Sequence, residues 1–253
     1  MKKYLTYLFV AIISVACSNQ NKTGDTQEEA TEAQSEEPQE MKEEVPAVCV
    51  WDNISVRETA SSKSKWLTSI SLGERIVFMG DEALDSTDND RLYYKIRLAD
   101  DTEGWAIADF IIPESSAGAF IVDADVYKRP DLLTKDDKSF SQMDIVAVKS
   151  TQDDWLEVVG RRSGSKWIEN GWVKNNTLSQ KDVDIAVAKF AAKALNVEDV
   201  EEKAEAIQEI LDNSDLSGSS FHDLLKAELE QLQAPVEPEV STDTLVQEAD
   251  SIQ

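Results

Sequence analysis

The chain has few of the residues that catalytic and metal sites use. It contains one histidine, His222, and two cysteines, Cys17 and Cys49. Nucleophile–histidine sites and most zinc sites need a histidine in a defined setting, and His222 lies early in a predicted helix beside Phe221. Cys49 stands between apolar neighbours in AVCVWD, which predicts a buried, inert thiol. The composition argues against an enzyme, and we expect no cofactor and no metal.

Basic residues are also scarce relative to acidic ones. Fifty Asp and Glu oppose 25 Lys and Arg, which gives a formal net charge of −25. Binding to nucleic acid needs a basic patch, so we expect no nucleic-acid partner. The loop DSTDND, with Asp85, Asp88 and Asp90, lacks the glycine and the closing glutamate of a calcium-binding EF-hand loop. We interpret it as a solvated loop.

The N-terminal apolar run is too short to cross a membrane. It extends from Tyr4 to Ala16, 13 residues, whereas a spanning helix needs about 20. Lys2 and Lys3 precede it, which is the pattern of a secretory signal peptide over residues 1–16. Its removal would take the net charge from −25 to −27.

The sequence Val15-Ala16-Cys17 at the end of this run resembles a bacterial lipoprotein signal. The resemblance implies cleavage before Cys17 and attachment of diacylglycerol to its thiol, hence a membrane anchor in the bacterial cell envelope. Ser18, rather than Asp, after the cysteine favours the outer membrane under the enterobacterial sorting rule. An ordinary secreted protein with an unmodified Cys17 and an uncleaved anchor are the alternatives.

Two segments have the composition of disordered chain. Residues 17–46 contain no aromatic residue and many Glu, and residues 234–253 are acidic with Pro235 and Pro238. Such segments bury too little apolar surface to offset the entropy of ordering. We interpret the first as an acidic tether and the second as a disordered tail.

Between residues 47 and 179 the pattern is typical of short strands. The runs 48–51, 75–79, 92–98 and 104–112 are rich in Val, Ile and aromatic residues. DNISVRETASSKSK and DEALDSTDND, which lie between them, have loop compositions. The same order then recurs, with FIVDADVYKRP matching CVWDNISVRET and each half running into Gly-Trp. The sequence therefore predicts two copies of one small β domain.

The repeated pattern resembles bacterial SH3 domains. In the first copy the matching residues are Val56-Arg57, Gly73-Glu74, Tyr94-Lys95-Ile96 and Gly104-Trp105. In the second copy they are Val126 with Arg129-Pro130, Met143-Asp144, Trp155-Leu156-Glu157-Val158 and Gly171-Trp172. The resemblance implies two SH3-like β-barrels, residues 47–113 and a divergent copy at residues 118–179, which lacks the turn glycine.

From residue 180 to 233 the apolar spacing becomes helical. Three stripes predict three amphipathic helices, led by Val183, Val197 and Phe221. We predict N-caps at Ser179, Asn196 and Ser220, each with an Asp three residues later. The expected fold class is mainly β with α: two SH3-like barrels, then a three-helix segment.

The SH3 resemblance implies an aromatic-lined groove for an extended peptide. Trp66 in KSKWLTS and Trp167 in GSKWIEN stand in polar surroundings, so we predict that both are exposed and bind ligand. Trp105 and Trp172 are interpreted as largely structural.

These expectations combine into a non-enzymatic envelope lipoprotein. Its barrels would bind peptidoglycan stem peptide or a partner protein. The alternative is a structural or assembly subunit of an envelope complex that has no small ligand. The sequence leaves the ligand, the membrane leaflet and the oligomeric state undetermined.

Overall fold

The computed structural model describes residues 43–234. The predicted signal peptide (residues 1–16), the lipid-attachment residue Cys17, most of the acidic tether and residues 235–253 of the tail lie outside the described residues. The described residues belong to one compact unit. It contains two seven-stranded sheets and three α-helices, which confirms the expected mainly β chain with a helical segment.

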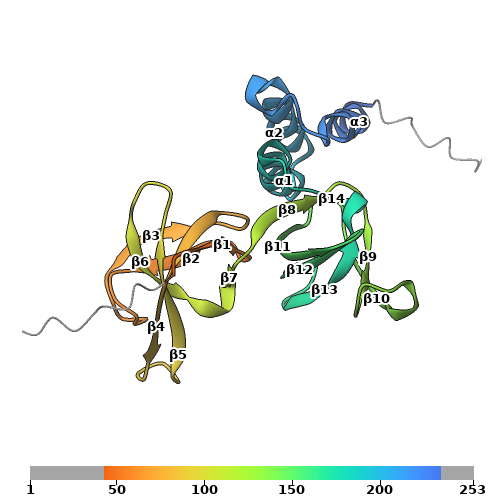
Figure 1. The fold of residues 1–253 in the computed structure, drawn as a ribbon. Helices are drawn as coiled ribbons and strands as arrows, with labels where there is room; N and C mark the ends of the chain where they lie inside the picture. The colour runs from red at the N-terminus through yellow and green to blue at the C-terminus, as the bar shows by residue number, and fades with distance from the viewer. Residues whose placement is uncertain (1–42, 235–253) are drawn as a thin grey trace, which may run out of the picture. The chain divides into compact units, whose positions relative to one another are not determined.

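The first repeat is a sheet with the strand order β3-β2-β6-β5-β4-β1-β7 (Figure 1). Its strands are β1 (Val45–Cys49), β2 (Ile54–Arg57), β3 (Trp66–Ile70), β4 (Arg75–Asp85), β5 (Arg91–Arg97), β6 (Glu103–Ile107) and β7 (Ile111–Pro113). Neighbouring strands are antiparallel. Alternate buried positions, such as Ile54 and Val56 in β2, face a core of their own.

The second repeat has the same topology, with the order β10-β9-β13-β12-β11-β8-β14. Its strands are β8 (Ser116–Phe120), β9 (Ala124–Tyr127), β10 (Lys135–Phe140), β11 (Ile145–Gln152), β12 (Trp155–Arg161), β13 (Ile168–Lys174) and β14 (Leu178–Ser179). Each strand takes the place of the strand seven positions earlier. The two sheets therefore share one strand order, which agrees with the repeated pattern in the sequence.

Equivalent Gly-Trp pairs explain part of the repeated sequence. A Cβ on Gly104 would lie 2.5 Å from Val56 Cγ1, and one on Gly171 would lie 2.5 Å from Val126 Cγ1. A side chain at either position would force its neighbour to shift, so the glycines allow β6 and β13 to approach β2 and β9 closely. The pairing also corrects the expected alignment, because Tyr127 rather than Arg129 takes the place of Arg57: Arg57 pairs with Trp105 and Tyr127 with Trp172.

The turn before β4 recurs before β11 with the same hydrogen bonds. The Ser71 backbone N–H donates to the Glu74 carboxylate (2.9 Å), and the Ser141 N–H donates to the Asp144 carboxylate (2.8 Å). Gly73 has φ 75° and Met143 has φ 71°. Methionine therefore takes the left-handed conformation that glycine takes in the first repeat, although an L-residue pays about 1–2 kcal/mol for it.

The sequence pattern missed three strand segments of the first repeat: β2, β3 and the end of β4. β2 lies inside a stretch that was expected to be a loop, because four residues with only two apolar positions give a weak signal. β4 continues to Asp85, so the start of the expected loop DSTDND belongs to a hairpin. Asp85 is buried rather than solvated and accepts hydrogen bonds from Thr87 and from the Ser62 backbone N–H, which lower its pKa.

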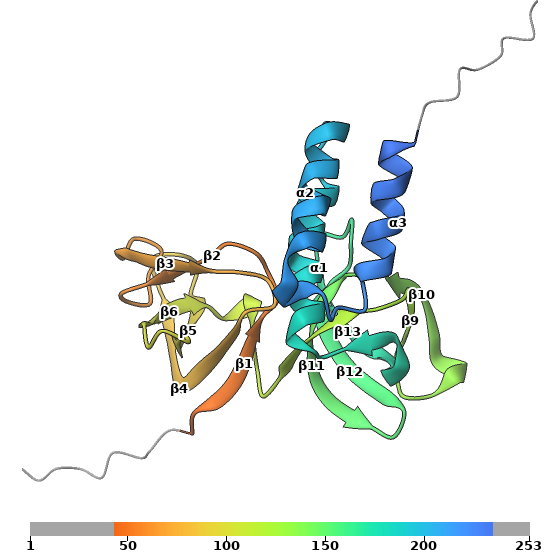
Figure 2. The same cartoon turned by 90° about the horizontal axis from the view of Figure 1, so that it is seen from above.

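The three helices are α1 (Asp182–Leu195), α2 (Val200–Asp212) and α3 (His222–Gln233). Helix α1 packs against β8 and β11, α2 packs on α1, and α3 packs on α2 (Figure 2). Their core also includes Val48 and Val50 from the first repeat. Single helices of this length are marginal in water, so this shared core stabilises them. None of these helices, within residues 43–234, has the length and apolarity of a membrane span.

The predicted N-caps are wrong for all three helices. Asn196 instead ends α1, and Asp199 caps α2 by accepting from the N–H groups of Glu201 and Glu202. The cap of α2 is therefore three residues after the predicted Asn196. Asp and Asn are both common N-caps because each has a side-chain oxygen that accepts from the first backbone N–H groups.

Ser179 and Ser220 both donate to one buried carboxylate, that of Asp184 in the first turn of α1. Ser219 Oγ (2.9 Å) and the Ser220 backbone N–H (2.6 Å) also donate to Asp184. Burial alone would raise the pKa of Asp184, but these hydrogen bonds hold it below its usual value. Asp184 therefore joins the end of β14, the start of α1 and the start of α3.

Candidate functional site

Both repeats and α1 meet at one point. A Cβ on Gly73, in the first repeat, would lie 2.9 Å from Ile145 Cγ2 of the second repeat and 3.4 Å from Ile185 Cγ2 of α1. The Arg75 guanidinium also forms an ion pair with Asp182 at the start of α1. Gly73 is therefore needed for close approach as well as for its positive φ.

Beside this contact lies a cavity of about 790 Å³, which we call the junction cavity. The two equivalent turns, the start of the β12–β13 loop and the C-terminal half of α1 form its walls. Its lining includes Leu72 from the first repeat, Met143 and Arg161 from the second, and Lys189 and Lys193 from α1. Its volume lies in the usual range for small-ligand sites.

The charge of the junction cavity is opposite to that of the chain. Four cationic side chains line it against two carboxylates, those of Asp52 and Asp144. The cationic residues are Arg161, Arg162, Lys189 and Lys193. In a chain with a formal net charge of −25, this local excess of positive charge can attract an anion where the surrounding surface repels one.

The two carboxylates of the cavity are engaged by backbone N–H groups. Asp144 accepts from the N–H groups of Ser141 and Ser163 and from the Ser163 hydroxyl at 2.7 Å. Asp52 accepts from the Leu72 N–H at 3.4 Å. They hold the turns and the loop in place, so their role in the cavity is structural.

Most of the cationic groups are not neutralised by the protein. Arg162 forms a two-pronged ion pair with Glu169, with Nη2–Oε1 3.0 Å and Nε–Oε2 3.3 Å. Among residues 43–234, no ion pair joins Arg161, Lys189 or Lys193 to a carboxylate. The charges of these three groups are therefore not neutralised within residues 43–234, although Arg161 Nη1 donates to the Ser165 carbonyl oxygen at 3.4 Å.

An aromatic ring of the first repeat positions Arg161. Its guanidinium carbon lies 4.5 Å from the centroid of the Trp51 ring, which is a cation–π contact between the two repeats. Trp51 in turn packs against Phe110, with centroids 5.4 Å apart. The first repeat thus orients a charged group that belongs to the second.

Cys49 is buried, as predicted, and lies next to this region. Its thiol donates to the Trp51 carbonyl oxygen (Sγ–O 3.0 Å). Burial raises the pKa of Cys49 to about 12. At neutral pH the thiol is protonated, which is the opposite of what a nucleophilic cysteine requires.

The two predicted ligand-binding tryptophans are exposed, as expected. Trp66 is 56% exposed at the start of the edge strand β3, and Trp167 is 76% exposed just before β13. They do not occupy equivalent positions, because β3 corresponds to β10, whereas Trp167 belongs to the loop that corresponds to residues 98–102. Neither lines the junction cavity, although Trp167 shares the β12–β13 loop with Arg162.

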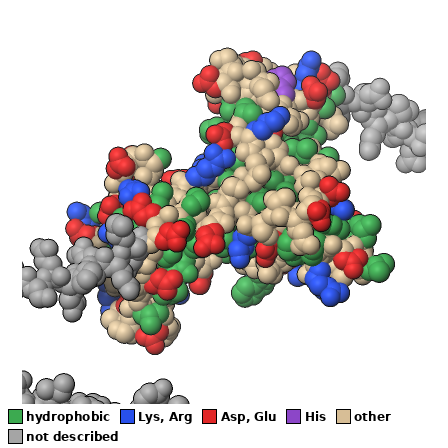
Figure 3. All heavy atoms as spheres, in the orientation of Figure 1, with side chains coloured by type: hydrophobic (Ala, Val, Ile, Leu, Met, Phe, Trp, Pro, Cys, Tyr) green, Lys and Arg blue, Asp and Glu red, His purple; other side chains and the backbone are tan. Residues whose placement is uncertain are grey.

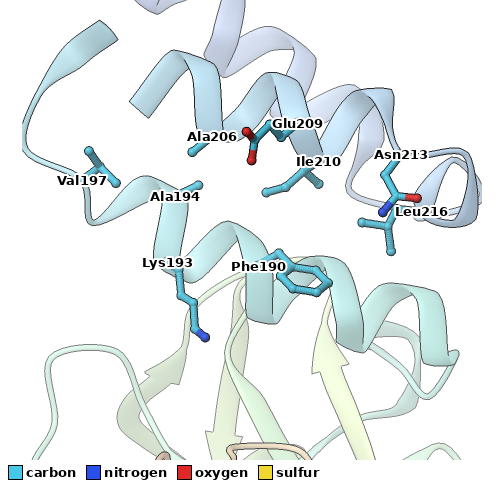
Figure 4. Close-up of a pocket in the computed structure, with 9 residues that line it drawn as sticks. All are labelled: Phe190, Lys193, Ala194, Val197, Ala206, Glu209, Ile210, Asn213 and Leu216. Atoms are coloured by element: carbon cyan, nitrogen blue, oxygen red, sulfur yellow. The ribbon is translucent and has the colours of Figure 1, made fainter. Parts of the chain in front are cut away.

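A second hollow lies between α1 and α2, with a volume of about 350 Å³ (Figure 4). Its lining is mainly apolar, and Phe190, which is 48% exposed, faces Ile210 across it. Lys193 directs its ammonium group away from α2 and also lines the junction cavity. The face drawn in Figure 3 otherwise carries interspersed acidic and basic side chains.

The sequence analysis missed the residues of the junction cavity. Two signals were present: the pair Arg161-Arg162 in an acidic chain, and Lys189 and Lys193 one turn apart on α1. Neither signal shows that the two elements meet, because the loop and the helix are brought together only by packing. Within residues 43–234, no group of three or more His, Cys, Asp or Glu side chains is arranged to hold a metal ion.

Comparison with known proteins gives little further information. No family model matches the chain, and no curated protein matches it. Among solved structures, NlpC2 from Trichomonas vaginalis aligns at 11% identity and a TM-score of 0.24, covering 67% of this chain and 57% of that one. NlpC1 from the same organism aligns at 11% identity and a TM-score of 0.23, covering 60% and 54%. The chain thus spans little more than half of each, and similarity at this level supports no conclusion.

Proposed function

We propose that the chain is a non-enzymatic lipoprotein of the bacterial cell envelope, anchored through acyl chains on Cys17. Its two repeats, residues 47–113 and 118–179, are SH3-like domains that bind an envelope ligand, and peptidoglycan stem peptide is the ligand we favour. The outer membrane is the proposed location. The repeated strand order and the Gly-Trp pairs support the SH3-like assignment.

The observation that carries the binding proposal is the junction cavity. Two repeats and a helix contribute to one concave, positively charged site in an otherwise acidic protein. Three of its four cationic groups, those of Arg161, Lys189 and Lys193, form no ion pair with a carboxylate of residues 43–234, and a site with uncompensated charge suits recognition of a charged ligand. Cys49, the one cysteine among residues 43–234, is protonated and buried, which supports binding rather than covalent catalysis.

The test is sedimentation of the lipid-free chain, residues 18–253, with isolated peptidoglycan sacculi. The whole mature chain is used because the helices share a core with both repeats, so removing them would expose apolar surface. Trp66→Ala and Trp167→Ala test the predicted aromatic contacts. Leu133→Ala is the matched control, since Leu133 is 94% exposed on the second repeat.

We expect saturable binding that Leu133→Ala leaves unchanged. Loss of binding in one tryptophan variant would locate part of the contact surface. Absence of binding at tens of micromolar protein would overturn the wall-binding proposal.

The hollow between α1 and α2 favours the alternative, an assembly subunit. An exposed phenylalanine beside an apolar hollow is the kind of feature that a partner protein covers. Affinity purification from envelope extracts with the wild-type chain and with Phe190→Asp tests it, and Leu133→Asp serves as the control. A partner that is lost only with Phe190→Asp would support assembly through the helices.

A further inference from the structure

The cationic groups of the junction cavity belong to two separate elements. Arg161 ends β12, whereas Lys189 and Lys193 lie one helical turn apart on α1. The cavity lining joins these elements, so a ligand in the cavity meets positive charge from a strand and from a helix. A ligand with one negative charge needs only one of these cationic groups. A ligand with two or more negative groups can bind the cations of the strand and of the helix together.

The groups also differ in what they offer a ligand. Arg161 presents a planar guanidinium, which recognises a carboxylate through two parallel hydrogen bonds. The two lysines present compact ammonium groups on flexible stems. The Arg161 guanidinium lies over the Trp51 ring, and its Nη1 donates to the Ser165 carbonyl oxygen at 3.4 Å. Its other N–H donors are available for a carboxylate.

The apolar part of the lining defines the rest of the ligand. Leu72, Met143 and Ile145 contribute apolar surface beside the charges. Short peptides with aliphatic side chains and free carboxylates combine both features. Nucleic acid would be repelled by the surrounding acidic surface, which the net charge of −25 implies.

We infer that the junction cavity binds the carboxylates of a wall stem peptide, with Arg161 and Lys189 as the residues that hold them. This inference rests on the proposed function and names the ligand group that the proposed site recognises. Lys193 adds positive charge at the rim that the cavity shares with the α1–α2 hollow.

The experiment is calorimetric titration of the lipid-free chain with soluble muropeptides released from sacculi. One arm uses muropeptides with free carboxylates, and a second uses the same material after amidation of its carboxylates. A third arm uses a glutamate-rich linear peptide as a protein-derived source of carboxylate. Each arm is run with the wild type, Arg161→Gln, Arg161→Lys, Lys189→Gln and the control Lys149→Gln.

Lys149 is a suitable control because it is an exposed cation of the second repeat that does not line the junction cavity. Loss of one charge-assisted hydrogen-bonded pair weakens binding by about tenfold or more. We expect that loss for Arg161→Gln and Lys189→Gln, partial recovery for Arg161→Lys, and no change for Lys149→Gln. Amidated muropeptides should bind as weakly as the variants do. Circular dichroism melts check that each variant is folded.

Equal affinity of wild type, Arg161→Gln and Lys189→Gln would overturn the inference, as would equal affinity for amidated and free muropeptides. Binding of the glutamate-rich peptide alone would also overturn it, because the carboxylate would then come from a protein. Sacculus sedimentation separates the two proposals. If Arg161→Gln still binds sacculi as the wild type does, wall binding stands and this site is wrong; if the wild type does not bind sacculi, the proposed function itself fails.

Discussion

The two repeats have the same strand order but use different side chains at equivalent places. Where the first repeat has Gly73, the second has Met143 with nearly the same φ. Where the first has Arg57, the second has Tyr127, which packs edge-on against Trp155. The backbone path is therefore retained while the chemistry of its surface changes.

The turn shows why glycine occurs in only one repeat. A positive φ is not sufficient reason, because Met143 also adopts it. Gly73 lies against Ile145 and Ile185, and a Cβ there would approach Ile145 Cγ2 to 2.9 Å. The first repeat thus needs glycine where it touches the second repeat and α1, whereas Met143 lines the junction cavity.

The largest expected effect concerns the helices, which follow the second repeat and have no counterpart after the first. Asp184→Ala leaves the donors of Ser179, Ser219 and Ser220 without an acceptor, and of these serines Ser219 is buried and Ser179 is half-buried. We expect a loss of about 4 kcal/mol in the free energy of unfolding, since a buried donor without a partner costs about 1–3 kcal/mol and the part-buried donors add to it. Urea unfolding followed by circular dichroism measures it. The control is Asp182→Ala, which removes an exposed ion pair and should cost less than about 1 kcal/mol.

The next effect contrasts the two turns. Gly73→Ala imposes a left-handed L-residue and a contact with Ile145, and we expect a loss of about 3 kcal/mol. Met143→Gly relieves the same backbone strain but removes partly buried apolar surface. We expect it to change the free energy of unfolding by less than about 1 kcal/mol. Equal losses in the two variants would show that φ alone decides the residue at this turn.

A smaller contrast lies at the two Gly-Trp pairs. A Cβ on Gly104 would meet Val56 Cγ1 at 2.5 Å and the Arg57 carbonyl oxygen at 2.9 Å, whereas one on Gly171 would lie 3.4 Å from the Tyr127 carbonyl oxygen. A backbone atom moves away from a new Cβ less easily than a side-chain atom does. We therefore expect Gly104→Ala to cost about 2 kcal/mol and Gly171→Ala about 1 kcal/mol, measured by thermal unfolding. A larger loss for Gly171→Ala would contradict this reasoning.

The smallest effect is the pH dependence that Asp184 contributes on the helical side. The folded pKa of Asp184 is below its ordinary value, so its contribution is present above the unfolded pKa of about 3.9. That contribution is lost as the pH falls through the folded pKa. The stability difference between wild type and Asp184→Asn should therefore stay constant from neutral pH down to about pH 4 and shrink only at lower pH. A difference that already shrinks well above pH 4 would mean that Asp184 is not the titrating group.

The sequence predicted the repeat and the helices because their signals are local. Gly-Trp pairs, β-branched runs and helical stripes report on each element by itself. The hydrogen bonds to Asp184 and the junction cavity depend on which elements pack together. The spacing of Ser179, Ser220 and Lys189 in the sequence does not indicate that packing. One signal was available: Asp184 shares a helix face with the buried residues Val187, Ala188 and Ala191, and a carboxylate on a buried face needs partners.

The strand pairing at the ends of each repeat has a mechanical consequence. β1 pairs antiparallel with β7, with Ala47 opposite Pro113, and β8 pairs antiparallel with β14, with Phe120 opposite Leu178. The entry and exit of each repeat therefore lie at the same end of one strand pair. A force that pulls the entry and the exit apart breaks the hydrogen bonds of the strand pair one after another, rather than all together in shear. Each repeat would therefore begin to unfold at a low pulling force.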